Sequence, residues 1–165
     1  MLASILTALP VHAAQLTIDL GNGSRTWSTA QLLEHPQAQD IDIPDDVSYK
    51  RTMHYRAVPM AALLEGVPVD AHLQAIATDG FAAEIPAAPL LHKSGSRAWL
   101  AIEDPAHPWP GLSKDKPGAG PFYLVWTDPA ASRISPEQWP YAVGKIRLLS
   151  PVAERFPALL PDAKL

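Results

Sequence analysis

One Pro- and Gly-rich stretch of the chain, PAHPWPGLSKDKPGAG, contains residue types that suit the binding of a phosphate. Lys114 and Lys116 supply positive charge, and Gly118 and Gly120 follow in the same stretch. Glycines let backbone N–H groups approach an anion closely, and the lysines add charge attraction. We therefore expect an anion anchor here. The alternative is a solvated loop whose lysines balance nearby aspartates.

A second candidate site lies on a strand expected over residues 48–56. His54 and Arg56 have the same parity and share one face of that strand, whereas Arg51 lies on the other face. An Arg and a His that converge on a cleft could bind an oxyanion or polarise a carbonyl group. The alternative is an exposed strand face with ordinary charges.

Asp79 is the third candidate, as a carboxylate beside a cofactor pocket. Its simplest role is local, because an Asp in a turn accepts hydrogen bonds from its own backbone. The six histidines show no His-x-His or His-x₃-His spacing, so the sequence predicts no metal site made of protein ligands. It assigns no catalytic residue either.

The element that positions Asp79 is a β-hairpin expected over residues 72–86, HLQAIATDGFAAEIP. Two apolar segments flank Asp79-Gly80, which favours a type I′ turn with positive φ at both central residues. After the turn, Phe81, Ala83 and Ile85 share one face, as expected for a half-buried strand.

Other local patterns predict short strands and helices along the rest of the chain. Ser28 and Gln31 form a capping-box pattern at the start of a helix, and Pro59 suits the start of another. Trp109, between two prolines, is a candidate lid or partner-contact residue. Strands are expected over residues 16–20, 25–27, 41–43, 98–104, 122–128 and 139–150, and helices from residue 28, over 60–65 and near 86–91.

This order of elements resembles the oxidoreductase molybdopterin-binding domain of sulfite-oxidase-like enzymes, in particular its small exported bacterial branch. The resemblance covers roughly residues 15–152. It is carried by Val58-Pro59, Asp79-Gly80-Phe81, Gly120-Pro121 and the closing strand WPYAVGKIRLLS. It implies an α+β fold with mixed β-sheets and short peripheral helices.

The resemblance also implies an exported oxidoreductase domain that binds molybdopterin and exchanges electrons with a periplasmic partner such as a c-type cytochrome. The pterin would then contact His54, Arg56, Asp79 and the loop from Lys114 to Gly120. In those enzymes a Cys thiolate binds molybdenum, and this chain has no Cys, so it also lacks the Cys-x-x-Cys-His motif of covalent haem. The alternative function is a non-catalytic module that keeps the fold without molybdenum and binds a small ligand or a protein, such as a periplasmic receptor.

Composition narrows the class of protein. A length of 165 residues is typical of one domain, and a formal net charge of −4 without a basic patch argues against nucleic-acid binding. The 18 prolines favour many short elements joined by rigid loops, because Pro is excluded from helix interiors and central strands.

The N-terminus indicates export. Residues 1–13 combine a short apolar run with a small-x-small cleavage pattern before Ala14, which is typical of the end of a signal peptide, although no Lys or Arg precedes Arg25. We expect residues 14–165 to form one periplasmic domain. The apolar run is too short to span a membrane.

Overall fold

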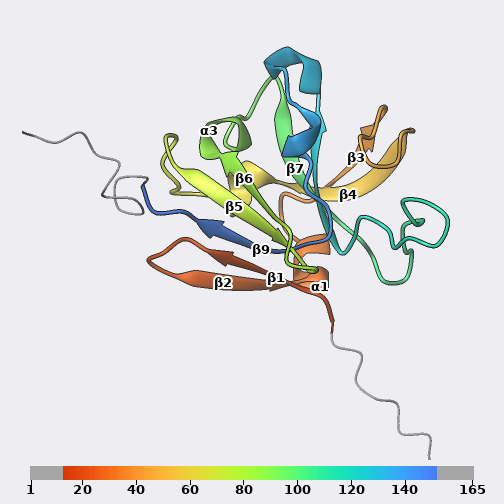
Figure 1. Cartoon of the computed structure of the whole chain (residues 1–165). Coiled ribbons are helices and arrows are strands. Elements are labelled where there is room, and N and C mark those ends of the chain that lie inside the picture. The colour runs from red at the N-terminus through yellow and green to blue at the C-terminus, as the bar shows by residue number, and fades with distance from the viewer. Residues whose placement is uncertain (1–12, 152–165) are drawn as a thin grey trace, which may run out of the picture.

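The computed structural model describes residues 13–151, and within them the chain forms two β-sheets with only short helices (Figure 1). The predicted leader falls almost entirely outside these residues. No helix in this range is long and apolar enough to cross a membrane. The elements are β1 (Gln15–Asp19), β2 (Ser24–Ser28), α1 (Thr29–Leu33), β3 (Gln39–Ile43), β4 (Met53–Pro59), α2 (Met60–Leu63), β5 (His72–Ala77), β6 (Ala82–Pro86), α3 (Ala87–Leu90), β7 (Arg97–Ile102), β8 (Phe122–Thr127), η1 (Pro129–Ser132), η2 (Pro136–Gln138) and β9 (Val143–Leu148).

The larger sheet has five strands in the order β2-β1-β9-β5-β6. Only the β1–β9 pair is parallel, so the sheet is mixed. Alternation explains its burial, since Leu16 and Ile18 face the core while Thr17 is half-buried. The turn between β1 and β2 uses Gly21 at a φ of 82°, a conformation that glycine adopts without steric cost.

The second sheet has four antiparallel strands in the order β3-β4-β7-β8. Every residue of β7 after Arg97 is buried, as is every residue of β8 before Thr127. Such continuous apolar strands are covered on both faces. One cover is the larger sheet, because Leu73 and Ile85 of that sheet line the same small interior void as Leu100 and Leu124. The molecule is mainly β, with mixed and antiparallel sheets and short helices.

The predicted hairpin is present as β5 and β6, but its turn differs from the expected one. Gly80 alone has a positive φ, of 91°, and Asp79 does not. The Gly80 N–H donates to the Ala77 carbonyl at 2.9 Å, and the Ala77 N–H donates to the Phe81 carbonyl at 2.7 Å. This is a three-residue loop with a glycine bulge, so the type I′ prediction was wrong.

Two predicted strands begin later in the structure than in the sequence analysis. The strand expected from residue 48 starts at Met53, because Ser48 and Tyr49 turn their N–H groups toward the Asp46 carboxylate. The strand expected from Trp139 starts at Val143. The residues before Val143 instead cross to β8, where the Leu124 N–H donates to the Pro140 carbonyl at 3.0 Å.

The predicted helix starts are confirmed. The Ser28 side chain accepts from the Gln31 N–H at 3.1 Å, and the Gln31 side chain accepts from the Ser28 N–H at 2.8 Å, which completes the capping box of α1. Pro59 precedes α2, which ends well before Gly66, a residue with a φ of 86°.

Candidate functional site

The structure places the predicted anion loop at the surface, between β7 and β8. Lys114 and Lys116 are exposed. The two glycines instead face oxygen atoms of the protein itself: a methyl group at Gly118 would lie 2.7 Å from the Pro110 carbonyl, and one at Gly120 would collide with Glu103 Oε1. A carbonyl and a carboxylate at these positions repel a phosphate, so the glycines serve close packing of the loop.

Side chains from the body of the domain hold this loop in place. The Tyr49 hydroxyl donates to the Pro110 carbonyl and accepts from the Ala119 N–H, both at 2.9 Å. The Trp109 N–H donates to Glu103 Oε2 at 2.7 Å. The loop is therefore fixed to the domain by hydrogen bonds from Tyr49 and to Glu103.

His54 and Arg56 share one face of β4, as the parity argument predicted, and that face is exposed. Each lies opposite an aspartate of β3 in the strand register: His54 Nδ1 pairs with Asp42, and Arg56 Nη1 lies 3.5 Å from Asp40. Polar pairs across two strands stabilise the pairing modestly. His54 is exposed and Arg56 is half-buried, and each side chain already lies beside a carboxylate.

Asp79 stabilises its own turn, as expected. Its Oδ1 accepts a hydrogen bond of 3.0 Å from the Phe81 N–H. Among the described residues, no hydrogen bond or ion pair joins Asp79, His54, Arg56, Lys114 or Lys116 to another member of this group. Each of these side chains whose partner is described pairs with a residue outside the group.

A buried carboxylate that the sequence analysis missed lies under the loop. Asp46 is 2% exposed. Its Oδ1 accepts from the Ser48 and Tyr49 N–H groups and from the Tyr123 hydroxyl, each at 2.9 Å, and its Oδ2 accepts from the Tyr55 hydroxyl at 2.6 Å. Four donors satisfy the charge, so Asp46 has a structural role.

Aromatic rings surround this carboxylate. Trp109 packs edge-on against Tyr55, with ring centroids 4.9 Å apart, and Tyr123 lies 6.4 Å from Trp139. Burial raises the pKa of both tyrosines above the usual value, and the negative charge of Asp46 adds to the effect. Trp109 is half-buried in this cluster, so the expectation of a lid or contact residue gives way to a packing role.

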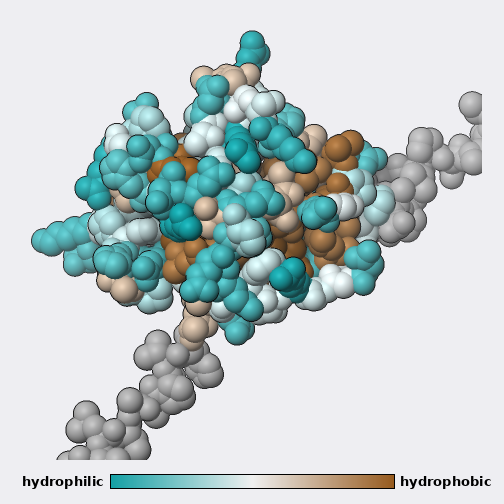
Figure 2. All heavy atoms as spheres, turned by 180° about the vertical axis from the view of Figure 1, so that it is seen from behind, coloured by the Kyte–Doolittle hydropathy of each residue, from teal (hydrophilic) through white to brown (hydrophobic). Residues whose placement is uncertain are grey.

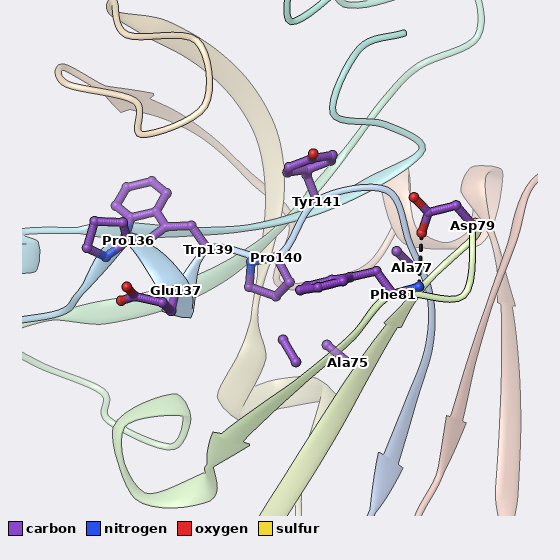
Figure 3. Close-up of a pocket in the computed structure, with 10 residues that line it drawn as sticks. Ala75, Ala77, Asp79, Phe81, Pro136, Glu137, Trp139, Pro140 and Tyr141 are labelled. Carbon is purple, nitrogen blue, oxygen red and sulfur yellow. Dashed lines mark hydrogen bonds between the residues drawn. The ribbon is translucent and has the colours of Figure 1, made fainter. Parts of the chain in front are cut away.

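A groove lies between the β5–β6 hairpin and the segment that contains η2 (Figure 3). Its volume is about 370 Å³. Small side chains of the hairpin form its floor, and rings and carboxylates form its walls. We call it the Phe81–Tyr141 groove, and its lining residues are Ala75, Ala77, Asp79, Phe81, Ala83, Pro136, Glu137, Trp139, Pro140 and Tyr141.

The groove is hollow because alanines occupy this part of the sheet face, where larger side chains would fill the space. Ala75, Ala77 and Ala83 lie on neighbouring positions of β5 and β6, where Ala75 pairs with Ala83. In Figure 3 the Phe81 ring extends across toward Pro140, and Tyr141 stands beside Asp79. Phe81 was expected on the same strand face as Ala83 and Ile85, but β6 begins at Ala82 and Phe81 is 70% exposed in the bulged turn.

Exposed aromatic side chains gather at this groove. The large apolar side chains exposed among residues 13–151 are Val69, Phe81 and Tyr141, and two of these three line the groove. On the face seen in Figure 2, apolar residues are visible in separate patches between polar ones.

The charges around the groove are negative. Its lining contains two carboxylates, Asp79 and Glu137, and no Lys, Arg or His. A hydrogen bond from the Ser135 side chain lowers the pKa of Glu137, which keeps that carboxylate ionised at neutral pH. No cluster of three or more His, Asp or Glu side chains suited to a metal ion occurs in the part of the chain that the structure describes.

Comparison with models of known protein families and with curated proteins finds no match to this chain.

Proposed function

We propose that this chain is a non-catalytic binding domain and that its ligand is a small molecule bound in the Phe81–Tyr141 groove. The observation that carries this proposal is the exposure of Phe81 and Tyr141 on the rim of one alanine-floored groove. Exposed aromatic rings are costly to hydrate, and a ligand that covers them gains apolar burial. The groove volume lies near the lower end of the range of small-ligand sites, roughly 300–1,000 Å³.

Several features argue against molybdopterin at the residues that the resemblance assigned to it. A side chain at Gly118 or Gly120 would meet protein oxygen atoms, and the His54 and Arg56 side chains already face aspartates. The chain also lacks a Cys for the metal.

Ligand binding is testable with three benzyl compounds that differ in charge: benzylammonium, benzyl alcohol and benzoate. Each would be titrated against protein carrying ¹³C-labelled alanine methyl groups. We expect at least one compound to shift the signals of Ala75, Ala77 and Ala83 saturably. Ligands of this size bind with dissociation constants on the order of millimolar.

A matched pair of variants locates the binding. Ala83→Leu fills the floor of the groove and should abolish the shifts at Ala75 and Ala77, whereas Ala82→Leu, on the opposite face of β6, should preserve them. Circular dichroism would confirm that both variants are folded. The proposal fails if no compound shifts these signals in the wild-type protein.

The competing function is a pterin-binding oxidoreductase with a partner such as a c-type cytochrome. Protein purified from a host that makes molybdenum cofactor would be analysed for molybdenum and for oxidised pterin. We expect neither at stoichiometric amounts. Stoichiometric pterin that is lost when Lys114 and Lys116 are both replaced by Ala would establish the oxidoreductase function instead.

We also propose that the domain is exported to the periplasm, on the strength of the leader pattern over residues 1–13. The N-terminus of the mature protein, determined from cells by mass spectrometry, tests this directly. Processing near Ala14 is the expected result, and retention of Met1 in the mature protein would contradict export.

A further inference from the structure

We infer that the ligand of the Phe81–Tyr141 groove is a small organic cation, in which an ammonium or similar head is attached to an apolar body. This inference rests on the proposed function, because it names the chemical class of the ligand for the same groove. Three features carry it: the aromatic walls, the carboxylates beside them, and the absence of any cationic side chain from the lining.

The walls of the groove present aromatic faces to a ligand. Phe81 is 70% exposed and Tyr141 is 48% exposed, while Trp139 is buried against Tyr123. The electron-rich face of an aromatic ring attracts a cation within about 6 Å of its centre. The exposed rings also cover an apolar body, so both parts of an organic cation find a partner.

The carboxylates give the groove its sign of charge. Asp79 uses Oδ1 to accept from the Phe81 N–H, and in Figure 3 its carboxylate lies on the same side of the hairpin as the Tyr141 ring. Glu137 lies at the other end of the groove in the same view. With no Lys, Arg or His in the lining to offset them, these two carboxylates attract a cation and repel an anion of the same shape.

Size argues for a free small molecule over a side chain of a partner protein. The groove volume of about 370 Å³ accommodates a single compact ligand, and its floor is closed by the hairpin alanines. A protein partner would instead require a wide surface around the groove, since stable protein interfaces bury roughly 800 Å² on each partner.

The three benzyl compounds test the inference because they share one apolar body. We expect benzylammonium to bind roughly tenfold more tightly than benzyl alcohol, from a ring contact and a solvent-exposed ion pair together, and benzoate to bind more weakly than either. Raising the salt concentration from about 0.05 M to about 0.5 M should weaken benzylammonium and leave benzyl alcohol unchanged.

Removal of one carboxylate provides the sharper test. Asp79→Asn keeps a side-chain oxygen to accept from the Phe81 N–H, so the turn is preserved while the charge is removed. The preference for benzylammonium over benzyl alcohol should fall roughly threefold, with the affinity for benzyl alcohol unchanged. Asp115→Asn removes the same charge from the exposed loop and should leave the preference intact.

The outcomes separate this inference from the proposed function. Binding of benzyl alcohol or benzoate as tight as that of benzylammonium would overturn the cation inference and leave the groove as a ligand site. The absence of any binding would overturn both. The capped peptide acetyl-Leu-Lys-Leu-amide would be titrated in the same way. If it bound tenfold more tightly than benzylammonium, the cation would belong to a protein partner, and the inference of a small-molecule ligand would be overturned.

Discussion

The Tyr55 hydroxyl donates a hydrogen bond of 2.6 Å to Oδ2 of Asp46 in the interior of the domain. Among the described residues it is the sole donor to that oxygen, whereas Oδ1 accepts from three donors. The bond joins β4 to the loop that precedes it. Tyr123 brings β8 to the same carboxylate.

This asymmetry predicts different costs for the two tyrosines. Tyr55→Phe leaves Oδ2 of a buried carboxylate without a donor and should lower the free energy of unfolding by about 2–3 kcal/mol. Tyr123→Phe leaves Oδ1 with two backbone donors and should cost about 1 kcal/mol. Urea unfolding measures both, with the exposed Tyr141→Phe as the control. A larger loss for Tyr123→Phe than for Tyr55→Phe would contradict the assignment.

The same tyrosines predict a loss of stability at alkaline pH. Burial raises the pKa of Tyr55 and of Tyr123, while unfolded tyrosines ionise near pH 10. Above that pH the unfolded chain binds fewer protons than the folded one, so this contribution is fully present below about pH 10 and is lost as the pH rises. Each tyrosine contributes a slope of about 1.4 kcal/mol per pH unit.

Unfolding by urea at a series of values from about pH 8 to about pH 11 measures that slope. Tyr123→Phe should reduce the slope by the contribution of one ionising group, about 1.4 kcal/mol per pH unit, because a Phe at this position does not ionise in either state. An identical slope in the variant would show that other groups cause the alkaline loss.

Close packing in the surface loop predicts contrasting effects for two glycines. Gly118→Ala places a methyl group 2.7 Å from the Pro110 carbonyl and should cost about 1–3 kcal/mol. Gly23→Ala meets nothing within 4 Å and has no positive φ, so it should be neutral or stabilise by up to about 1 kcal/mol through the unfolded state. Thermal unfolding of the two variants compares them. Equal stability of the two variants would mean that the loop accommodates the methyl group at residue 118 without losing stability.

The capping box of α1 predicts a measurable cost for a small change. Ser28→Ala removes the acceptor for the Gln31 N–H and should lower the free energy of unfolding by about 1 kcal/mol. Ser24→Ala, on an exposed position of β2, is the matched control and should change stability by less than about 0.5 kcal/mol. A loss below that limit for Ser28→Ala would show that tertiary contacts alone hold the helix.

The sequence determined the features that depend on neighbours along the chain. Alternation predicted β1 and most of β6, the Ser28–Gln31 spacing predicted the start of α1, and Asp79-Gly80 predicted a hairpin. Parity placed His54 and Arg56 on one face of β4. These features follow from backbone sterics and local hydrogen bonds, which act over a few residues.

The tertiary structure decided the rest, because packing joins residues that no periodicity connects. Asp46 and Tyr123 are 77 positions apart, and their bond exists only because the second sheet places β7 between β4 and β8. The groove likewise joins Ala75 and Phe81 of the hairpin to Tyr141, which lies just before β9. The exposure of Phe81 depends on how the end of the larger sheet packs against the distant segment before β9. Local sequence patterns do not contain that information.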